Sequence, residues 1–161
     1  MVKVKMEKTN VMRLLEQAKI PYNAHCYVDT DAISGVEVAR VLGEDPDRVF
    51  KTLVTVGRPR QYYVFMIPVA CELDLKKAAA AVGEKSIVML PAKELLPLTG
   101  YVHGGCSPVG MKKFFPTVIH ASAENFPSIM FSAGKIGYQV EADPKAIAGY
   151  VRARFVDVIF C

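Results

Sequence analysis

The run Val49-Phe50-Lys51-Thr52-Leu53-Val54-Thr55-Val56 is followed, after Gly57-Arg58-Pro59-Arg60 and one further residue, by Tyr62-Tyr63-Val64-Phe65-Met66-Ile67. Both runs are rich in β-branched and aromatic residues, which favour strands. The segment between them carries the glycine and proline typical of a turn. This pattern predicts a β-hairpin, and a sheet is therefore the element around which the rest of the chain must be organised.

Helices are expected before and after this hairpin in the sequence, because residues that cap helix starts precede several apolar patterns. The capping signals are Thr9-Asn10, the box Ser34-Gly35-Val36-Glu37, Asp74 and Asp143-Pro144. The predicted helices are 11–18, a helix from the box up to Gly43, 75–82, a short helix from Pro91 to 95 or 96, and 145–150. Asp45-Pro46 predicts one further helical turn.

Additional strands are expected where apolar residues alternate or run together between turn signals. They cover residues 22–28, 86–90, 117–120, 129–132, 137–140 and 155–160. Helices and strands intermix, and several strands are joined by hairpins, so the sheet should be mixed rather than purely parallel. The sequence predicts a single α/β or α+β domain spanning residues 1–161.

The composition sets broad limits on function. The chain has 161 residues, of which 52% are hydrophobic, and no apolar run approaches the roughly 20 residues that span a bilayer. Twenty basic against sixteen acidic residues give a net charge of +4, too mild an excess to establish a nucleic-acid partner. We expect no membrane association.

The cysteines carry a second expectation. Cys26, Cys71, Cys106 and Cys161 are far apart in the sequence, and no CxxC pair occurs. The three histidines are equally scattered, so neither a metal site nor another cofactor is expected. We also expect no disulfide, and a cytoplasmic protein.

Lys51 is the first candidate site residue, because it is a cation inside an apolar strand. Two interpretations are open. Lys51 could be an edge-strand lysine that extends to water, or a cation in a pocket wall that meets an anion or a developing oxyanion.

The second candidate is Thr99-Gly100-Tyr101-Val102-His103-Gly104-Gly105-Cys106-Ser107-Pro108-Val109-Gly110. Its glycines either permit turns in a surface loop or let the backbone approach a ligand. It has neither the P-loop nor the GxGxxG spacing. Cys106 fits a small buried side chain better than a nucleophile, because no histidine is placed by the sequence to activate it.

Other residues have two readings as well. Ser132-Ala133-Gly134 ends an apolar strand and could form either a simple turn or the floor of a pocket. Tyr27 and Tyr101 could supply hydroxyls or a stacking face to a ligand, or belong to the core.

Several of these segments, taken in order, resemble the YbaK/EbsC family over nearly the whole chain. The resemblance is carried by Lys8-Thr9-Asn10, Leu14-Leu15, Ile20-Pro21-Tyr22, Phe50-Lys51-Thr52-Leu53, Glu72-Leu73-Asp74-Leu75-Lys76-Lys77, Thr99-Gly100-Tyr101, Gly104-Gly105-x-Ser107-Pro108-x-Gly110-x-Lys112-Lys113 and Ser132-Ala133-Gly134. The family comprises aminoacyl-tRNA deacylases that clear mischarged tRNA, notably cysteinyl-tRNA for proline, and is related to the editing domain inserted in bacterial prolyl-tRNA synthetases.

The resemblance implies a small α/β domain with a mixed, barrel-like sheet, flanking helices and no metal. By position, Lys51 matches the essential lysine, Gly104 matches a glycine of the substrate loop, and Tyr27 falls at the pocket tyrosine. The other residues expected to bind substrate lie in the segments that carry the resemblance; they are Thr52, Tyr101, Gly105, Ser107, Ser132 and Gly134. The partners implied are the acceptor end of aminoacyl-tRNA and prolyl-tRNA synthetase.

The expected activity is trans-editing deacylation of Cys-tRNA(Pro). Backbone N–H groups of Gly104 and Gly105 are candidate oxyanion donors, and Lys51 would hold the tRNA end or stabilise the leaving oxygen. In the family the nucleophile is thought to be the thiol of the substrate, or else water. The alternative is a non-catalytic module that uses the same pocket to bind a tRNA end, a nucleotide or a regulatory partner.

Overall fold

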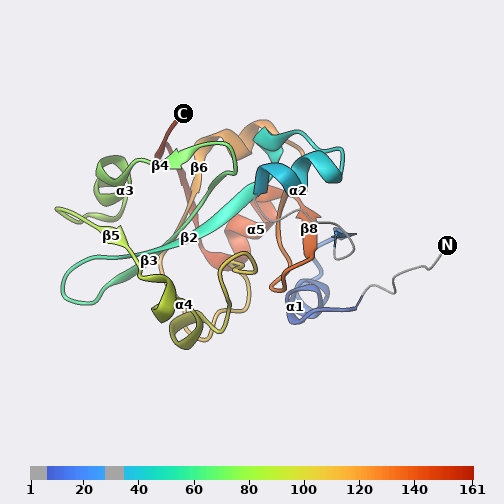
Figure 1. Ribbon diagram of the computed structural model, residues 1–161, viewed down its shortest axis with the longest axis horizontal. Helices are drawn as coiled ribbons and strands as arrows, with labels where there is room; N and C mark the ends of the chain where they lie inside the picture. Colours follow the sequence, from blue (N-terminus) through green and yellow to red (C-terminus); the bar gives the residue numbers. More distant parts are fainter. Residues whose placement is uncertain (1–6, 28–34) are drawn as a thin grey trace.

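The predicted hairpin is the centre of the largest sheet. The computed structural model describes residues 7–27 and 35–161. In it, β2 (Phe50–Val56) and β3 (Tyr62–Pro68) pair antiparallel from Phe50 opposite Pro68 to Val56 opposite Tyr62. Strand β2 crosses the middle of the molecule in Figure 1. The hairpin prediction is therefore confirmed.

This sheet has five strands in the order β5-β2-β3-β6-β9. The added strands are β5 (Val88–Met89), β6 (Thr117–His120) and β9 (Arg154–Val156). Strand β5 is antiparallel to β2, whereas β6 is parallel to β3 and β9 is parallel to β6. The sheet is mixed, as the sequence predicts.

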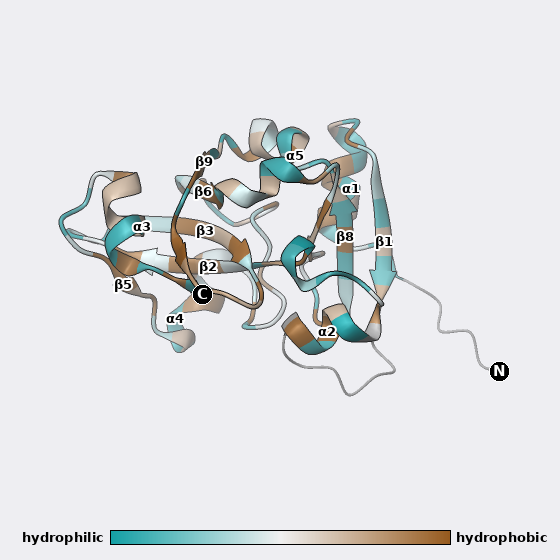
Figure 2. Ribbon diagram, turned by 90° about the horizontal axis from the view of Figure 1, so that it is seen from above, coloured by the Kyte–Doolittle hydropathy of each residue, from teal (hydrophilic) through white to brown (hydrophobic). Residues whose placement is uncertain are grey.

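A second, antiparallel sheet has the order β1-β8-β7. Its strands are β1 (Tyr22–Cys26), β7 (Ile129–Ser132) and β8 (Tyr138–Ala142). Figure 2 shows β1 and β8 side by side at one end of the molecule, α3 and β5 at the other, and β2 and β3 between them. An isolated parallel bridge between Val49 and Met130 connects the two sheets at the start of β2. The described strands form separate sheets and do not close into a barrel.

Three of the helices begin where their capping residues predict. The helices are α1 (Asn10–Gln17), α2 (Gly35–Val41), α3 (Leu75–Val82), α4 (Ala92–Thr99) and α5 (Pro144–Val151), with 3-10 turns at Pro46–Arg48 (η1) and Ala121–Asn125 (η2). The side chains of Thr9, Asp74 and Asp143 accept hydrogen bonds from the first backbone N–H groups of α1, α3 and α5. Val28 and Ser34 of the predicted strand and capping box lie outside the described residues. Helix α4 runs past Pro97 to Thr99, so it is longer than expected, and η2 was not expected.

The C-terminal segment differs from its prediction. The single strand expected over 155–160 is interrupted at Asp157-Val158 and forms two strands, β9 and β10 (Ile159–Phe160). Strand β10 pairs with β4 (Glu72–Leu73), a strand too short to be read from the sequence. Figure 1 shows the C-terminus beside β4.

This pairing brings two cysteines together. Cys71 and Cys161, 90 positions apart in the chain, form a disulfide with a Cα–Cα distance of 4.7 Å. The expectation of no disulfide is therefore wrong. It rested on separation along the sequence, and strand pairing removes that separation.

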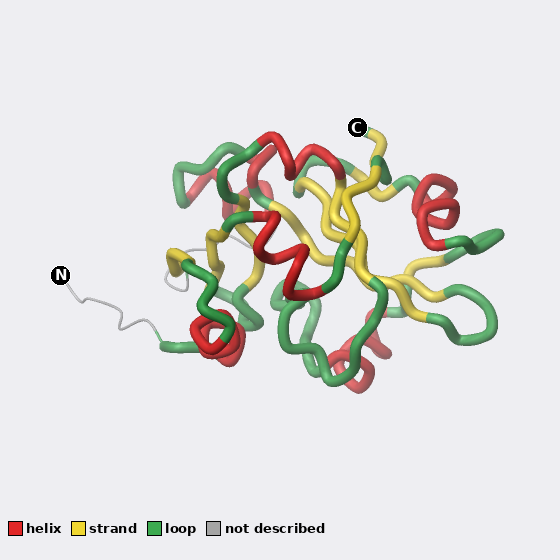
Figure 3. The backbone as a smooth tube through the Cα atoms, turned by 180° about the vertical axis from the view of Figure 1, so that it is seen from behind, coloured by secondary structure: helices red, strands yellow, loops and turns green. Residues whose placement is uncertain are grey.

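Strand β3 is buried on both faces. Met66 belongs to a core cluster with Leu15 of α1 and Phe131 of β7, whereas Phe65 and Ile67 pack in a second cluster with the alanines of α3. Figure 3 shows the helices arranged around the strands. Among the described helices, none is long and apolar enough to cross a membrane.

Candidate active site

The first half of β2 places Lys51 and Thr52. Lys51 lies opposite Ile67 of β3, but β5 on the other side of β2 pairs only with Thr55 and Val56. Between the Val49–Met130 bridge and the pairing with β5, this edge of β2 is therefore open, and Lys51 is half-buried there. Within residues 7–27 and 35–161, the Lys51 ammonium has no hydrogen-bond or ion-pair partner. A half-buried cation without a partner is free to meet an anionic or polar ligand.

The glycine loop that follows α4 is fixed against the turn between β7 and β8. Gly104 has a φ of +87°, which side-chain-bearing residues rarely adopt. At Gly105, an added Cβ would lie 3.1 Å from the backbone nitrogen of Ile136. The Gly105 N–H donates to the Val102 carbonyl at 3.0 Å. Gly105 thus serves the close approach of two backbones, and its N–H is already used.

Between β2 and this loop lies a cavity of about 320 Å³. The predicted residues that it brings together are Tyr27, Lys51, Thr52, Gly104 and Ser132. Its remaining lining is Val36, Val38, Phe50, Leu53, Val69, Leu95, His103, Cys106 and Gln139. The cavity lining is therefore mixed, with apolar walls and several polar side chains that include one amine. Small-molecule sites likewise combine apolar walls with a few placed polar groups.

Strand register explains one edge of the cavity. Ser132 at the end of β7 lies directly opposite Gln139 of β8, so the two side chains meet the same space. The Oε1 atom of Gln139 and the Oγ1 atom of Thr52 are buried, and neither has a hydrogen-bond partner in the described part of the chain. Buried polar atoms are nearly always hydrogen-bonded. These two atoms are therefore candidates to hydrogen-bond a polar ligand in the cavity.

Four predicted site residues do not line the cavity: Tyr101, Gly105, Ser107 and Gly134. The Tyr101 hydroxyl donates to the Val109 carbonyl, and burial raises its pKa to about 12. The Ser107 side chain is fully buried and accepts from the Val109 N–H at 3.4 Å. Both hydrogen bonds are made within the loop, so Tyr101 and Ser107 stabilise its conformation.

Cys106 lines the cavity, but its chemistry is unsuited to attack. The residue is 7% exposed and packs with Val54, Val64 and Phe115. Burial raises the pKa of its thiol to about 12, so the nucleophilic thiolate is scarce near neutral pH. The geometry agrees with the interpretation of Cys106 as a small buried side chain.

Sequence reasoning assigned no role to His103 and did not single out Gln139, although both line the cavity. For Gln139 a signal was present, since an uncharged polar residue interrupts an apolar strand. For His103 the sequence offered only its position in the glycine loop.

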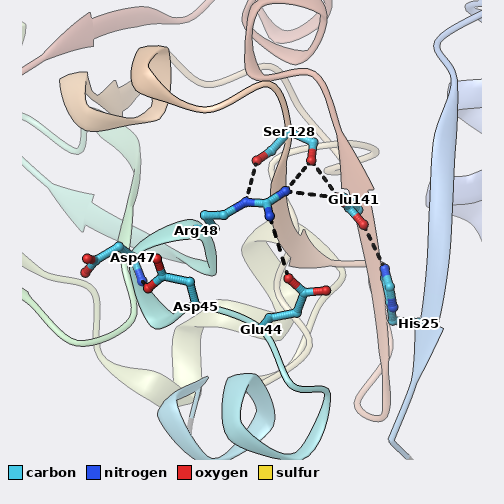
Figure 4. Close-up of polar contacts among 7 residues, drawn as sticks. All are labelled: His25, Glu44, Asp45, Asp47, Arg48, Ser128 and Glu141. Atoms are coloured by element: carbon cyan, nitrogen blue, oxygen red, sulfur yellow. Dashed lines mark hydrogen bonds and ion pairs between the residues drawn. The ribbon is translucent and has the colours of Figure 1, made fainter.

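A separate cluster of charged side chains connects η1 with strands β1 and β8 (Figure 4). Arg48 of η1 donates to the Ser128 hydroxyl at 2.6 Å and pairs with Glu141 at 3.2 Å and Glu44 at 3.9 Å. Glu141 also accepts from the Ser128 hydroxyl and contacts His25 at 3.0 Å. The Ser128 hydroxyl, then His25 and Arg48, hold the pKa of Glu141 below its ordinary value.

Three members of this cluster could in principle hold a metal ion. The ligand atoms of His25, Glu44 and Glu141 lie within 4.8 Å of one another. The Arg48 guanidinium already pairs with both carboxylates, however. We therefore regard the cluster as a structural network that fixes η1 against β8.

Comparison with known proteins places these features in a family. The model of the aminoacyl-tRNA editing domain family matches residues 20–149. A curated protein of Enterococcus faecalis, EbsC, is 46% identical over 153 residues, which cover 94% of this chain and 93% of the relative. Its name assigns it provisionally as a Cys-tRNA(Pro)/Cys-tRNA(Cys) deacylase.

Solved structures share the fold at lower identity. A crystal structure described provisionally as a trans-editing enzyme for prolyl-tRNA synthetase is 24% identical, covers 94% of this chain and 95% of that one, and has a TM-score of 0.81. The crystal structure of a hypothetical protein is 20% identical, covers 93% and 99% of the two chains, and has a TM-score of 0.85.

Proposed function

Because the chain belongs to the aminoacyl-tRNA editing domain family, we propose that it is a trans-editing deacylase that releases cysteine from mischarged Cys-tRNA(Pro). The observation that carries the proposal is the ammonium of Lys51, which has no partner among the described residues and lies in the wall of a cavity with mixed apolar and polar lining. The 46% identity to EbsC supports cysteine as the amino acid, and the name of that relative includes tRNA(Pro) beside tRNA(Cys) as the carrier.

The cavity fits a reaction that needs stabilisation of charge more than a protein nucleophile. An aminoacyl ester has a good leaving group, the ribose oxygen at the end of the tRNA. The protein has to orient the ester and stabilise negative charge as it develops on oxygen. Lys51 supplies a cation for the leaving oxygen or for the adjacent phosphate.

Gly104 is the proposed oxyanion donor. Its backbone N–H has no hydrogen-bond partner in residues 7–27 and 35–161, whereas the Gly105 N–H is held by Val102. We therefore assign this role to Gly104 alone. Its positive φ keeps the peptide in a conformation that other residues would adopt only with strain.

The remaining cavity residues bind the substrate in this proposal. Thr52 and Ser132 offer hydroxyls to the α-amino group or the ribose, and the buried ring of Tyr27 closes one wall. These contacts position the ester without reacting with it.

The nucleophile is the cysteine thiol of the substrate. Its sulfur attacks its own carbonyl carbon, a C–S bond forms, and the bond to the ribose oxygen breaks. The proton lost from sulfur ends on that oxygen, so cysteine leaves the tRNA as its cyclic thioester. The raised pKa of Cys106 supports an external nucleophile.

Prolyl-tRNA synthetase is the proposed partner. A deacylase that acts in trans must capture the charged tRNA after its release, and docking on the enzyme that charges tRNA(Pro) shortens that interval. Co-migration of the two proteins with tRNA(Pro) in a sizing column tests this step.

The deciding assay follows cysteine release from pre-charged Cys-tRNA(Pro) by the purified chain. The proposal predicts release that depends on enzyme concentration, with Ala-tRNA(Pro) as the control without a thiol. The competing candidate, a binding module, predicts that Cys-tRNA(Pro) binds but keeps its cysteine.

A further inference from the structure

A second cavity, of about 480 Å³, is lined by the continuation of the loop that lines the first. Residues 103–106 of the loop include the lining of the active-site cavity, and residues 108–115 include that of the second. We call the second cavity the loop groove. Its lining is Asn10, Leu14, Pro108, Gly110, Met111, Lys112, Lys113, Phe114, Phe115, Thr117, Tyr150 and Val151. The buried Ser107 connects the two stretches of the loop.

The loop groove is positively charged. Lys112 and Lys113 line it, and the described residues that line it include no aspartate or glutamate. Arg152, next to the lining residue Val151, holds its guanidinium 5.9 Å from the centre of the Phe114 ring. The groove therefore presents cations with no acidic neighbour in its own lining.

Two of the aromatic side chains that line the loop groove are exposed to solvent. Phe114 is 65% exposed and Tyr150 of α5 is 39% exposed. Exposed apolar side chains that gather in one groove with a polar rim are typical of an interaction site, whereas a single one would not be. Cations that follow a phosphate backbone, combined with aromatic faces on which bases stack, are the features of sites for single-stranded nucleic acid.

We propose that the loop groove binds single-stranded nucleotides of the tRNA acceptor end, while the esterified terminal nucleotide occupies the active-site cavity. The inference rests on the proposed function, because that function brings an aminoacyl-tRNA to the loop. Phe114 and Tyr150 stack on bases, and Lys112 and Lys113 contact phosphates. An acidic protein surface would match the lysines but would leave the two aromatic faces unexplained.

The test measures binding of uncharged tRNA(Pro) to the full chain at several salt concentrations. Phe114→Ala should weaken binding roughly 5- to 150-fold, the effect of losing one stacked base. Lys113→Gln should lower the slope of log affinity against log salt by about one, because one phosphate contact is lost. The matched controls are Phe160→Ala and Lys85→Gln, an exposed phenylalanine and lysine outside the groove. Both should bind like the unchanged protein.

A small ester separates this inference from the proposed function. In this proposal, cysteine esterified to the 3′-hydroxyl of adenosine occupies the active-site cavity alone, because it lacks the nucleotides assigned to the loop groove. Phe114→Ala should cleave it at the unchanged rate, while its KM for Cys-tRNA(Pro) rises. Unchanged tRNA affinity in Phe114→Ala and Lys113→Gln, or equal losses in the two controls, would overturn the inference.

The two proposals also fail differently. If Phe114→Ala weakens tRNA binding but the unchanged protein cleaves neither ester, the loop-groove inference is supported and the deacylase activity is refuted. A protein that cleaves both esters with no dependence of tRNA binding on the groove would do the reverse.

Discussion

Lys51 on β2 and Gly104 in the loop after α4 line one cavity, although they are 53 positions apart in the sequence. In the described part of the chain, neither the Lys51 ammonium nor the Gly104 N–H has a hydrogen-bond partner. A cation and an amide donor are thus available to the same ligand. The proposed ester cleavage requires such a cation and such an amide donor in one cavity.

Dependence on the substrate thiol is the first prediction. Ser-tRNA(Pro) differs from Cys-tRNA(Pro) by one atom, and its hydroxyl is a much weaker nucleophile than a thiol. Cysteine should therefore be released far faster than serine when both substrates are compared under single-turnover conditions. Equal rates would refute attack by the thiol and would point to water.

Cys106→Ala addresses the protein's own thiol. The rate should stay within a few-fold of the unchanged protein, since burial raises the pKa of this thiol to about 12 and it serves as packing. Removing its sulfur should lower stability by roughly 1 kcal/mol, the usual scale for deleting a small buried group. An inactive variant with a normal melting temperature would restore a covalent mechanism.

Gly134 packs closely against Tyr101 of the glycine loop. An added Cβ there would lie 2.9 Å from both Tyr101 Cε1 and Val11 Cγ2, at a φ of +88°. Gly134→Ala should cost roughly 1–3 kcal/mol of unfolding free energy, from backbone strain together with the clash. The control, Gly149→Ala, faces open space inside α5 and should stabilise by roughly 0.5–1 kcal/mol. Urea unfolding of both variants measures the difference, and similar effects at the two sites would contradict the assigned contacts.

Glu141 should make stability depend on pH in the acid range. Its pKa is lowered in the folded state, chiefly by the Ser128 hydroxyl and also by His25 and Arg48. Its contribution is therefore complete above the unfolded pKa and is lost as pH falls through the lower folded pKa. Glu141→Gln should cost roughly 1.5–3 kcal/mol at pH 7, the scale of a hydrogen bond to a charged group.

Unfolding of Glu141→Gln and the unchanged protein in urea, from pH 7 into the acid range, checks this. The stability difference should shrink as Glu141 becomes protonated. A difference that is constant with pH would mean that the carboxylate charge does not contribute.

Features set by local sequence were predictable. The caps at Thr9, Asp74 and Asp143 and the β2–β3 hairpin follow from neighbouring residues, and the structure has them where expected. The mixed sheet also follows from strands joined by hairpins.

Features set by long-range pairing were not predictable. The β4–β10 ladder and the Cys71–Cys161 disulfide depend on where the chain returns after β9. The presence of Gln139 in the cavity depends on the register of β7 and β8. Strand alternation was also insufficient at β2, where residues 50–53 all line the cavity.

The most direct test of the central claim is the rate of Cys-tRNA(Pro) deacylation by Lys51→Ala, measured beside its thermal melting curve. The rate should fall by a factor of about 10² to 10³, or roughly 3–4 kcal/mol of barrier, as for the loss of one oxyanion-type donor. Lys51→Arg should also be impaired, because a planar guanidinium does not replace a compact ammonium. Lys85→Ala, at an exposed turn, is the control. Melting should be unchanged, because Lys51 has no partner within the described residues to lose. A Lys51→Ala protein that melts normally and retains full activity would contradict the account.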